Sequence, residues 1–93
     1  MSGTTEGDEH NRRKRLRFRA WHRGMREVDL ILGPFADAHL ETLDPPKLDD
    51  FEALLAVPDN DLYDWFTGRE APPRQFNLTL VELIRAHAQR RIL

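Results

Sequence analysis

The chain has 93 residues, no cysteine and a net charge of −2 at pH 7. A chain of this length forms a single domain with a small core, so an enclosed active site would compete with that core for the same apolar side chains. The absence of cysteine excludes disulfide bonds, thiolate zinc sites and a cysteine nucleophile. The one serine is Ser2, which excludes a serine nucleophile in a folded site. We therefore expect a binding protein and not an enzyme.

We expect no targeting signal in this sequence. No apolar run approaches the roughly 20 residues that span a bilayer. Residues 1–10 are acidic and lack both the apolar region of a signal peptide and the arginine-rich character of a mitochondrial presequence. We expect no membrane insertion and a bacterial cytoplasmic location.

The charges are segregated along the chain. Up to Arg26 there are eight Lys or Arg residues against three acids, a balance of +5, whereas Glu27 to Leu93 carries six against thirteen, a balance of −7. This asymmetry favours a partner that is electrostatically steered to the basic end, either a nucleic acid or an acidic protein surface.

The first predicted elements are a tail and a basic helix. Residues 1–11 have no hydrophobic periodicity and predict a disordered N-terminal tail. From Arg12 to Arg23, apolar residues recur at helical spacing between basic ones, and Gly24 can adopt the left-handed conformation that ends a helix. The apolar residues of this helix are Leu16, Phe18, Ala20 and Trp21.

A second helix is predicted from Met25 to about Leu40, with Val28, Leu32 and Phe35 on its apolar face. Gly33-Pro34 interrupts the pattern and either kinks or splits this helix. We favour a kink because the apolar phase is the same on both sides.

Three shorter helices follow. Asp44 and two prolines begin the third; Asp59 or Asn60 caps the fourth, which Gly68 ends; and Asn77, or Thr79 in a capping box with Glu82, opens the fifth. Their apolar residues are Leu48, Phe51, Leu54 and Leu55, then Leu62, Tyr63, Trp65 and Phe66, then Leu80, Leu83, Ile84, His87 and Ala88. We predict an all-α fold in which residues 12–93 form one small five-helix bundle.

The segment from Arg23 to Asp29 is the strongest candidate site. Gly24 lets a partner approach the backbone closely, Arg23 offers a planar donor, and Glu27 lies in the first turn of a helix. The simpler interpretation is a turn glycine flanked by a surface ion pair between Arg23 and Glu27, four residues apart. Spacing alone favours the simpler interpretation.

This segment resembles the Arg-Gly-x-x-Glu motif of the SdhE family, also called succinate dehydrogenase assembly factor 2. The resemblance covers roughly residues 14–90. It includes the aromatic residues before the motif, the apolar stretch from Leu30 to Phe35, the Leu54-Leu55 pair, and a pattern of aspartate and tryptophan from Asp61 to Trp65.

The resemblance implies a non-enzymatic FAD assembly factor. Such a factor binds the flavoprotein subunit of succinate dehydrogenase, and in bacteria often that of fumarate reductase, and promotes the covalent attachment of FAD within the partner. It implies that the chain itself holds no stable cofactor, in agreement with the lack of a glycine-rich dinucleotide-binding turn. The residues that we expect to bind the partner are Arg23, Gly24 and Glu27, with Arg19, Arg26, Asp29 and Trp65 around them.

The alternative is a small nucleic-acid-binding or regulatory, antitoxin-like module that uses the basic 12–26 segment. We favour it less because the other helices are acidic and offer no recognition helix. Most of the aromatic residues are expected in the core, but Trp65 and Phe66 are adjacent, so we expect one of them to be partly exposed. The four histidines have no metal-ligand spacing, which predicts no metal site.

Overall fold

The computed structural model describes the backbone of residues 2–92 and the side chains of residues 7–90. It consists of α1 (Ser2–Trp21), α2 (Arg26–His39), the short 3-10 helix η1 (Leu40–Thr42), α3 (Pro45–Leu55), α4 (Asp59–Thr67) and α5 (Leu78–Ile92). Within this range there is no strand, so the predicted all-α fold is confirmed. None of these helices is both long enough and apolar enough to cross a membrane.

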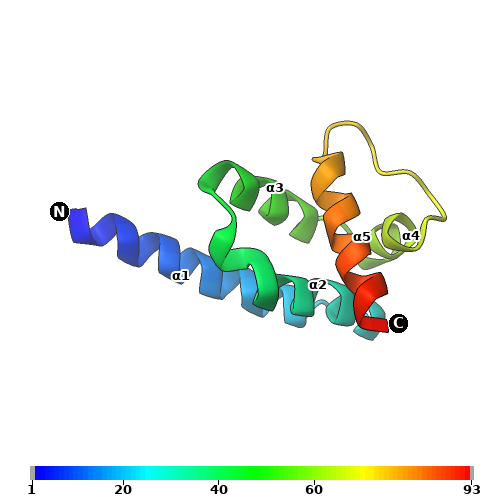
Figure 1. Ribbon diagram of the computed structural model, residues 1–93, viewed down its shortest axis with the longest axis horizontal. Helices are drawn as coiled ribbons and strands as arrows, with labels where there is room; N and C mark the ends of the chain where they lie inside the picture. The colour runs from blue at the N-terminus through cyan, green and yellow to red at the C-terminus, as the bar shows by residue number, and fades with distance from the viewer. Residues whose placement is uncertain (1, 93) are drawn as a thin grey trace.

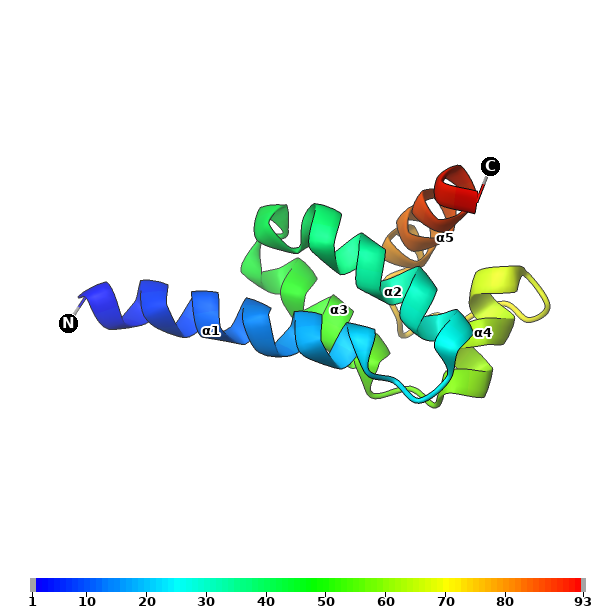
Figure 2. The same ribbon diagram turned by 90° about the horizontal axis from the view of Figure 1, so that it is seen from below.

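Helices α1 and α2 lie side by side and form the long axis of the molecule (Figures 1 and 2). Leu16 and Ala20 face the core from α1, where both are buried. Gly33 of α2 lies against the ring of Trp21, since a Cβ built at this glycine would be 2.3 Å from Trp21 Cδ2. The glycine thus lets the two helices approach closely.

Helix α2 is the centre of the bundle, because α1, α4 and α5 all pack against it. Its Val28, Leu32 and Phe35 are buried, and Phe35 stacks on Phe51 of α3 with ring centroids 6.0 Å apart. The other fully buried large side chains come from α1, α3, α4, α5 and η1: Leu16, Leu40, Leu48, Leu54, Leu62, Val81 and Ile84.

The Gly33-Pro34 pair does not split α2, which continues through it to His39. Both residues are buried. A proline removes one backbone donor from a helix, but burial of apolar residues on both sides of Pro34 holds the two turns together. The prediction that helical structure continues to Leu40 is confirmed, because η1 begins at Leu40 directly after α2.

The predicted helix ends are confirmed at three positions. Asp44 caps α3, where its carboxylate accepts a hydrogen bond from the backbone of Lys47 at 3.1 Å. Asn77 caps α5 by accepting from the backbone of Leu80 at 3.0 Å, so the alternative start at Thr79 is wrong. Gly68 ends α4 with a φ of +81°.

The start of α4 was predicted incorrectly. Its N-cap is Pro58, which makes no side-chain hydrogen bond, and Asp59 is the first helical residue. The carboxylate of Asp59 binds Arg23 instead of capping its own helix. Asp59 therefore forms a long-range ion pair with Arg23 and does not form the predicted local cap.

Helix α1 extends back to Ser2, where the sequence predicted a tail without structure over residues 1–11. Met1 lies outside the described residues. Extending a helix that is already formed needs no new nucleation, and Glu9 pairs with Arg13 one turn later at 3.9 Å. In Figure 1 this part of α1 projects beyond the rest of the molecule.

Candidate functional site

The turn between α1 and α2 is built around Gly24. Its φ is +106°, a left-handed conformation that side chains with a Cβ rarely adopt, which confirms the predicted role of this glycine. The position is exposed, and a Cβ here would meet only Asp59 Oδ2 at 3.7 Å. The glycine is therefore needed for the backbone conformation and not to avoid a clash, because a Cβ would make only an ordinary contact with Asp59.

Arg23 fastens this turn to the corner between α3 and α4. Its Nε donates to Asp59 Oδ1 at 2.8 Å, its Nη2 donates to the carbonyl of Val57 at 2.5 Å, and its Nη1 donates to the carbonyl of Leu55. Leu55 is the last residue of α3, where helix carbonyls lack partners within the helix. Arg23 thus closes the end of a helix that lies 32 residues away in the sequence.

The ion pair of Arg23 and Asp59 is largely buried, with side chains 12% and 19% exposed. Of the simpler interpretation of the sequence, the turn glycine is confirmed, whereas the ion pair between Arg23 and Glu27 is wrong. No spacing rule connects residues 23 and 59, so only the folded chain reveals this contact.

Asp29 holds the same turn from the opposite direction. Its Oδ1 accepts a hydrogen bond from the backbone N–H of Arg23 at 2.7 Å. Asp29 is half-buried in the first turn of α2, so this bond links the two helices across Gly24. Together, Arg23 and Asp29 make the turn rigid.

Glu27 and Arg26 are the exposed side chains of this turn. Among the described residues, neither side chain forms a hydrogen bond or an ion pair. Glu27 lies in the first turn of α2, where the positive end of the helix dipole favours a carboxylate. A free carboxylate and a free guanidinium are thus presented on a rigid support.

The other two predicted partner-binding residues, Arg19 and Trp65, differ in their exposure. Arg19 is exposed on α1 and approaches Glu52 of α3 at 3.6 Å. Trp65 is only 8% exposed and packs on Phe76 with centroids 5.1 Å apart, and its neighbour Phe66 is also buried. The expectation that one of the two is partly exposed is wrong, because the ring of Trp65 is covered by the loop before α5.

An exposed aromatic pair lies at the C-terminal end of α1, although most of the aromatic residues had been expected in the core. Phe18 is 64% exposed and stacks on His22 with centroids 4.0 Å apart, beside a shallow hollow that Lys14, Arg17 and Trp21 complete. Phe18 had been assigned to the apolar face of the helix. The signal was present, since Leu16 and Ala20 are one turn apart and Phe18, midway between them, must point the other way.

The basic segment of α1 is largely used within the fold. Arg12 binds Asp49 at 2.6 Å and Glu52 at 2.9 Å, and these hydrogen bonds raise the pKa of its guanidinium. Arg13 donates to the carbonyls of Leu40 and Leu43. Arg17 pairs with acids of α2 and η1, Asp37 and Glu41. A phosphate backbone would have to compete with these contacts, which removes the main basis for the nucleic-acid alternative.

No group of three or more metal-ligating side chains occurs in the part of the chain that the structure describes. The only two histidines near each other in that part are His39 and His87, whose ring centroids are 5.3 Å apart. Both are half-buried and pack on Phe35, at the edge of the core.

Residues 14–88 match the protein-family model described as flavinator of succinate dehydrogenase. The chain is 42% identical over 74 residues to the FAD assembly factor SdhE of Acetobacter pasteurianus, which covers 80% of this chain and 68% of that protein. It is 34% identical to a mitochondrial succinate dehydrogenase assembly factor 2 of Dictyostelium discoideum and 36% identical to that of Cryptococcus neoformans.

The matches to these two mitochondrial proteins cover 83% and 91% of this chain, but only 55% and 49% of the relatives. The chain thus spans about half of their length. No solved structure matches it. The family model nevertheless covers nearly all of the helical domain, including the whole turn around Gly24. The chain therefore belongs to the family of flavinators of succinate dehydrogenase.

Proposed function

We propose that this protein is a FAD assembly factor that binds the flavoprotein subunit of succinate dehydrogenase and promotes covalent attachment of FAD to that subunit. Family membership and the names of the relatives support this function. The observation that assigns this function to a site is the free carboxylate of Glu27, which lies next to a turn fixed by Arg23. A docking surface that is rigid before binding loses little entropy when the partner arrives.

The predicted partner-binding residues divide into three groups. Gly24, Arg26 and Glu27 contact the partner, with Arg19 at the edge of the same surface. Arg23 and Asp29 are positioning residues, since their polar atoms are bonded within the fold. Trp65 supports the fold from within the core.

The chemistry takes place in the partner. The flavin becomes bonded to a histidine of the flavoprotein subunit, and the factor holds that subunit in an orientation where bond formation proceeds. Glu27 contributes by orienting this histidine or by shifting its protonation. The factor is therefore not an enzyme. It binds no flavin stably, so the purified protein should show no absorbance in the flavin region.

The bacterial relative supports a site of action in the bacterial cytoplasm. The flavoprotein of fumarate reductase is a second client in this proposal, because it presents the same flavin chemistry to the same surface.

The test is covalent flavin on the flavoprotein subunit, measured as denaturation-resistant fluorescence in cells with and without the protein. Glu27→Ala should fail to restore flavin attachment in cells that lack the protein. Glu27→Gln separates charge from shape: it should also fail if the carboxylate acts on the partner's histidine, and should succeed if Glu27 only docks.

Glu70→Ala is the matched control. Glu70 is also an exposed glutamate that, among the described side chains, forms no ion pair, but it lies in the loop after α4. The Glu70→Ala variant should restore flavin attachment fully. Equal flavin attachment with and without the protein would refute the proposed function, and equal behaviour of the two variants would refute the site.

A further inference from the structure

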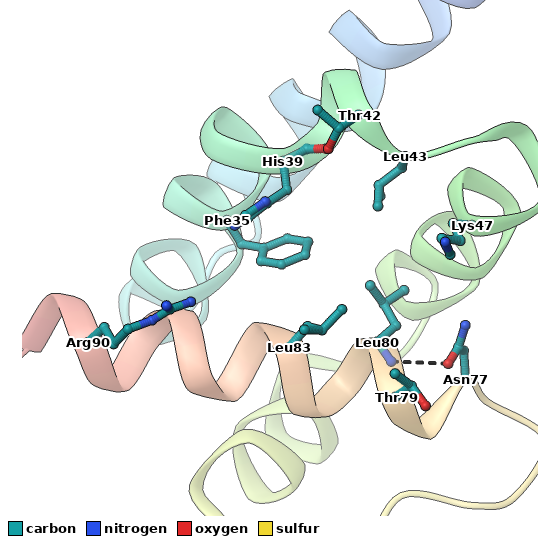
Figure 3. Close-up of a pocket in the computed structure, with 10 residues that line it drawn as sticks. All are labelled: Phe35, His39, Thr42, Leu43, Lys47, Asn77, Thr79, Leu80, Leu83 and Arg90. Atoms are coloured by element: carbon teal, nitrogen blue, oxygen red, sulfur yellow. Dashed lines mark hydrogen bonds between the residues drawn. The ribbon is translucent and has the colours of Figure 1, made fainter.

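A groove lies at the other end of α2 from Glu27, between α2, η1, α3 and α5 (Figure 3). Its cavity volume is about 270 Å³. The α2 helix has 14 residues, so the groove lies about 20 Å from the turn around Gly24. We refer to it as the α5 groove; the residues that line it are Phe35, His39, Thr42, Leu43, Lys47, Asn77, Thr79, Leu80, Leu83 and Arg90.

The floor of the α5 groove is apolar. Figure 3 shows the ring of Phe35 and the side chains of Leu80 and Leu83 directed toward one another between the helices. Leu83 was predicted in the buried stripe of α5, but it is 52% exposed. It is one of four large apolar residues that the described surface exposes. A partner's apolar group that covers Leu83 and the floor of the groove removes apolar surface from water.

The rim of the groove is cationic. Lys47 and Arg90 lie at opposite ends of the apolar residues in the view of Figure 3, and no acidic residue lines the groove. Among the described side chains, neither Lys47 nor Arg90 forms an ion pair. This distinguishes them from six arginines of this protein that pair internally: Arg12, Arg13, Arg17, Arg19, Arg23 and Arg85.

Two unpaired cations flanking an apolar floor are complementary to an apolar group with a negative charge on each side. We propose that the α5 groove is a second docking site, which binds a protein segment in which a bulky apolar side chain is flanked by carboxylates. The apolar side chain lies on Phe35 and Leu83, and the carboxylates meet Lys47 and Arg90.

The size and charge of the groove favour a partner segment over other occupants. Its volume is just below the range of about 300–1,000 Å³ that is usual for small-molecule sites, and it suits one or two side chains. A second copy docking through the same groove would place like charges together, which opposes a symmetric dimer. The acidic residues 2–11 of a second copy contain no bulky apolar side chain to serve as the anchor.

The test uses a fluorescein-labelled synthetic peptide with a phenylalanine between two pairs of glutamates. A second peptide carries lysines in place of the glutamates. Binding to the full chain is measured by fluorescence anisotropy, and the contact is located by two-dimensional NMR of the ¹⁵N-labelled protein. We expect the acidic peptide to bind and to shift resonances of Phe35, His39 and Leu83, and the lysine peptide not to bind.

Matched variants separate this groove from the basic face of α1. Lys47→Glu with Arg90→Glu should weaken binding of the acidic peptide at least tenfold. Lys14→Glu with Arg15→Glu changes the net charge equally on exposed residues of α1 and should leave binding within about twofold. Leu83→Gln should weaken binding, whereas Leu30→Gln, at an equally exposed leucine of α2, should not.

Three results would overturn the proposal: no binding of the acidic peptide, equal binding of both peptides, or loss of binding in the α1 double variant and not in the groove double variant. None of these measurements involves a flavoprotein. The outcome is therefore independent of the flavin-attachment test.

Discussion

Arg23 joins three parts of the chain through one side chain. Its guanidinium contacts the last carbonyl of α3, the carbonyl of Val57, and Asp59 at the start of α4. In a chain this short, few other groups can replace these bonds. Arg23 therefore contributes to folding as well as to the shape of the docking surface.

We predict that Arg23→Ala lowers the free energy of unfolding by about 2 kcal/mol, because it leaves Asp59 and two carbonyls without this donor in a largely buried position. Urea denaturation followed by tryptophan fluorescence measures this loss. Arg26→Ala, at an exposed and unpaired arginine three residues later, should change the free energy by less than about 0.5 kcal/mol. Equal effects of the two variants would contradict the positioning role of Arg23.

The candidate site was predictable from the sequence only in part. The conformation of Gly24 follows from its position after a basic helix, and the place of Glu27 in the first turn of α2 follows from the helix that begins after this glycine. The contacts of Arg23 do not follow, because residues 55–59 reach it only after α3 has folded back. The burial of Trp65 was also unpredictable, since it depends on where the loop containing Phe76 lies.

At the scale of helices, the close contact between α1 and α2 depends on Gly33, which has no side chain. Trp21 covers Gly33, and its indole Nε1 donates to Asp37 Oδ1 at 3.2 Å one turn further along α2. The tryptophan therefore lies flat across the helix where the glycine leaves space. From the sequence, Gly33 was interpreted only as an interruption of the second helix.

We predict that Gly33→Ala lowers the free energy of unfolding by about 1–3 kcal/mol, because the added methyl group would be 2.3–2.6 Å from the Trp21 ring and must displace it. Thermal unfolding and near-ultraviolet circular dichroism of the tryptophan report both effects. Gly7→Ala is the control: a Cβ there meets no atom within 4 Å, so this variant should be neutral or slightly stabilising. If Gly33→Ala were equally neutral, the close packing of these helices would be refuted.

Apolar periodicity predicted the helices well because each helix of a small bundle buries one face, and the residues of that face recur at helical spacing. Each predicted helix is present, and Asp44, Gly68 and Asn77 mark their ends as expected. The errors arose where a long-range contact competed with a local rule. Asp59 binds Arg23 instead of capping α4, and Phe76 of the loop before α5 covers Trp65.

For the whole molecule, the long dimension of 47 Å reflects the projection of α1 beyond the other helices (Figure 2). The described side chains at the start of this projection, Gly7 and Asp8, are exposed. Further along α1, Arg12 and Arg13 bind α3 and the segment around η1. The boundary between the projecting and the packed part of α1 therefore lies near Asn11.

We predict that deletion of residues 1–8 lowers the helix content but changes the free energy of unfolding by less than about 0.5 kcal/mol. Deletion of residues 1–13 removes the bonds of Arg12 and Arg13 as well, and should cost about 1–3 kcal/mol. Circular dichroism and urea denaturation measure both quantities. A large loss of stability in the shorter deletion would place the boundary closer to the N-terminus.

The bonds between Arg23 and the corner of α3 and α4 also have a kinetic consequence. Since the turn around Gly24 has its shape before any partner arrives, encounter with the partner is followed by no folding step in this protein. Association should then be a single phase whose rate rises linearly with partner concentration and falls with salt. A change at Asp59 would introduce a slow phase, because it removes the ion pair that fixes Arg23 in this turn.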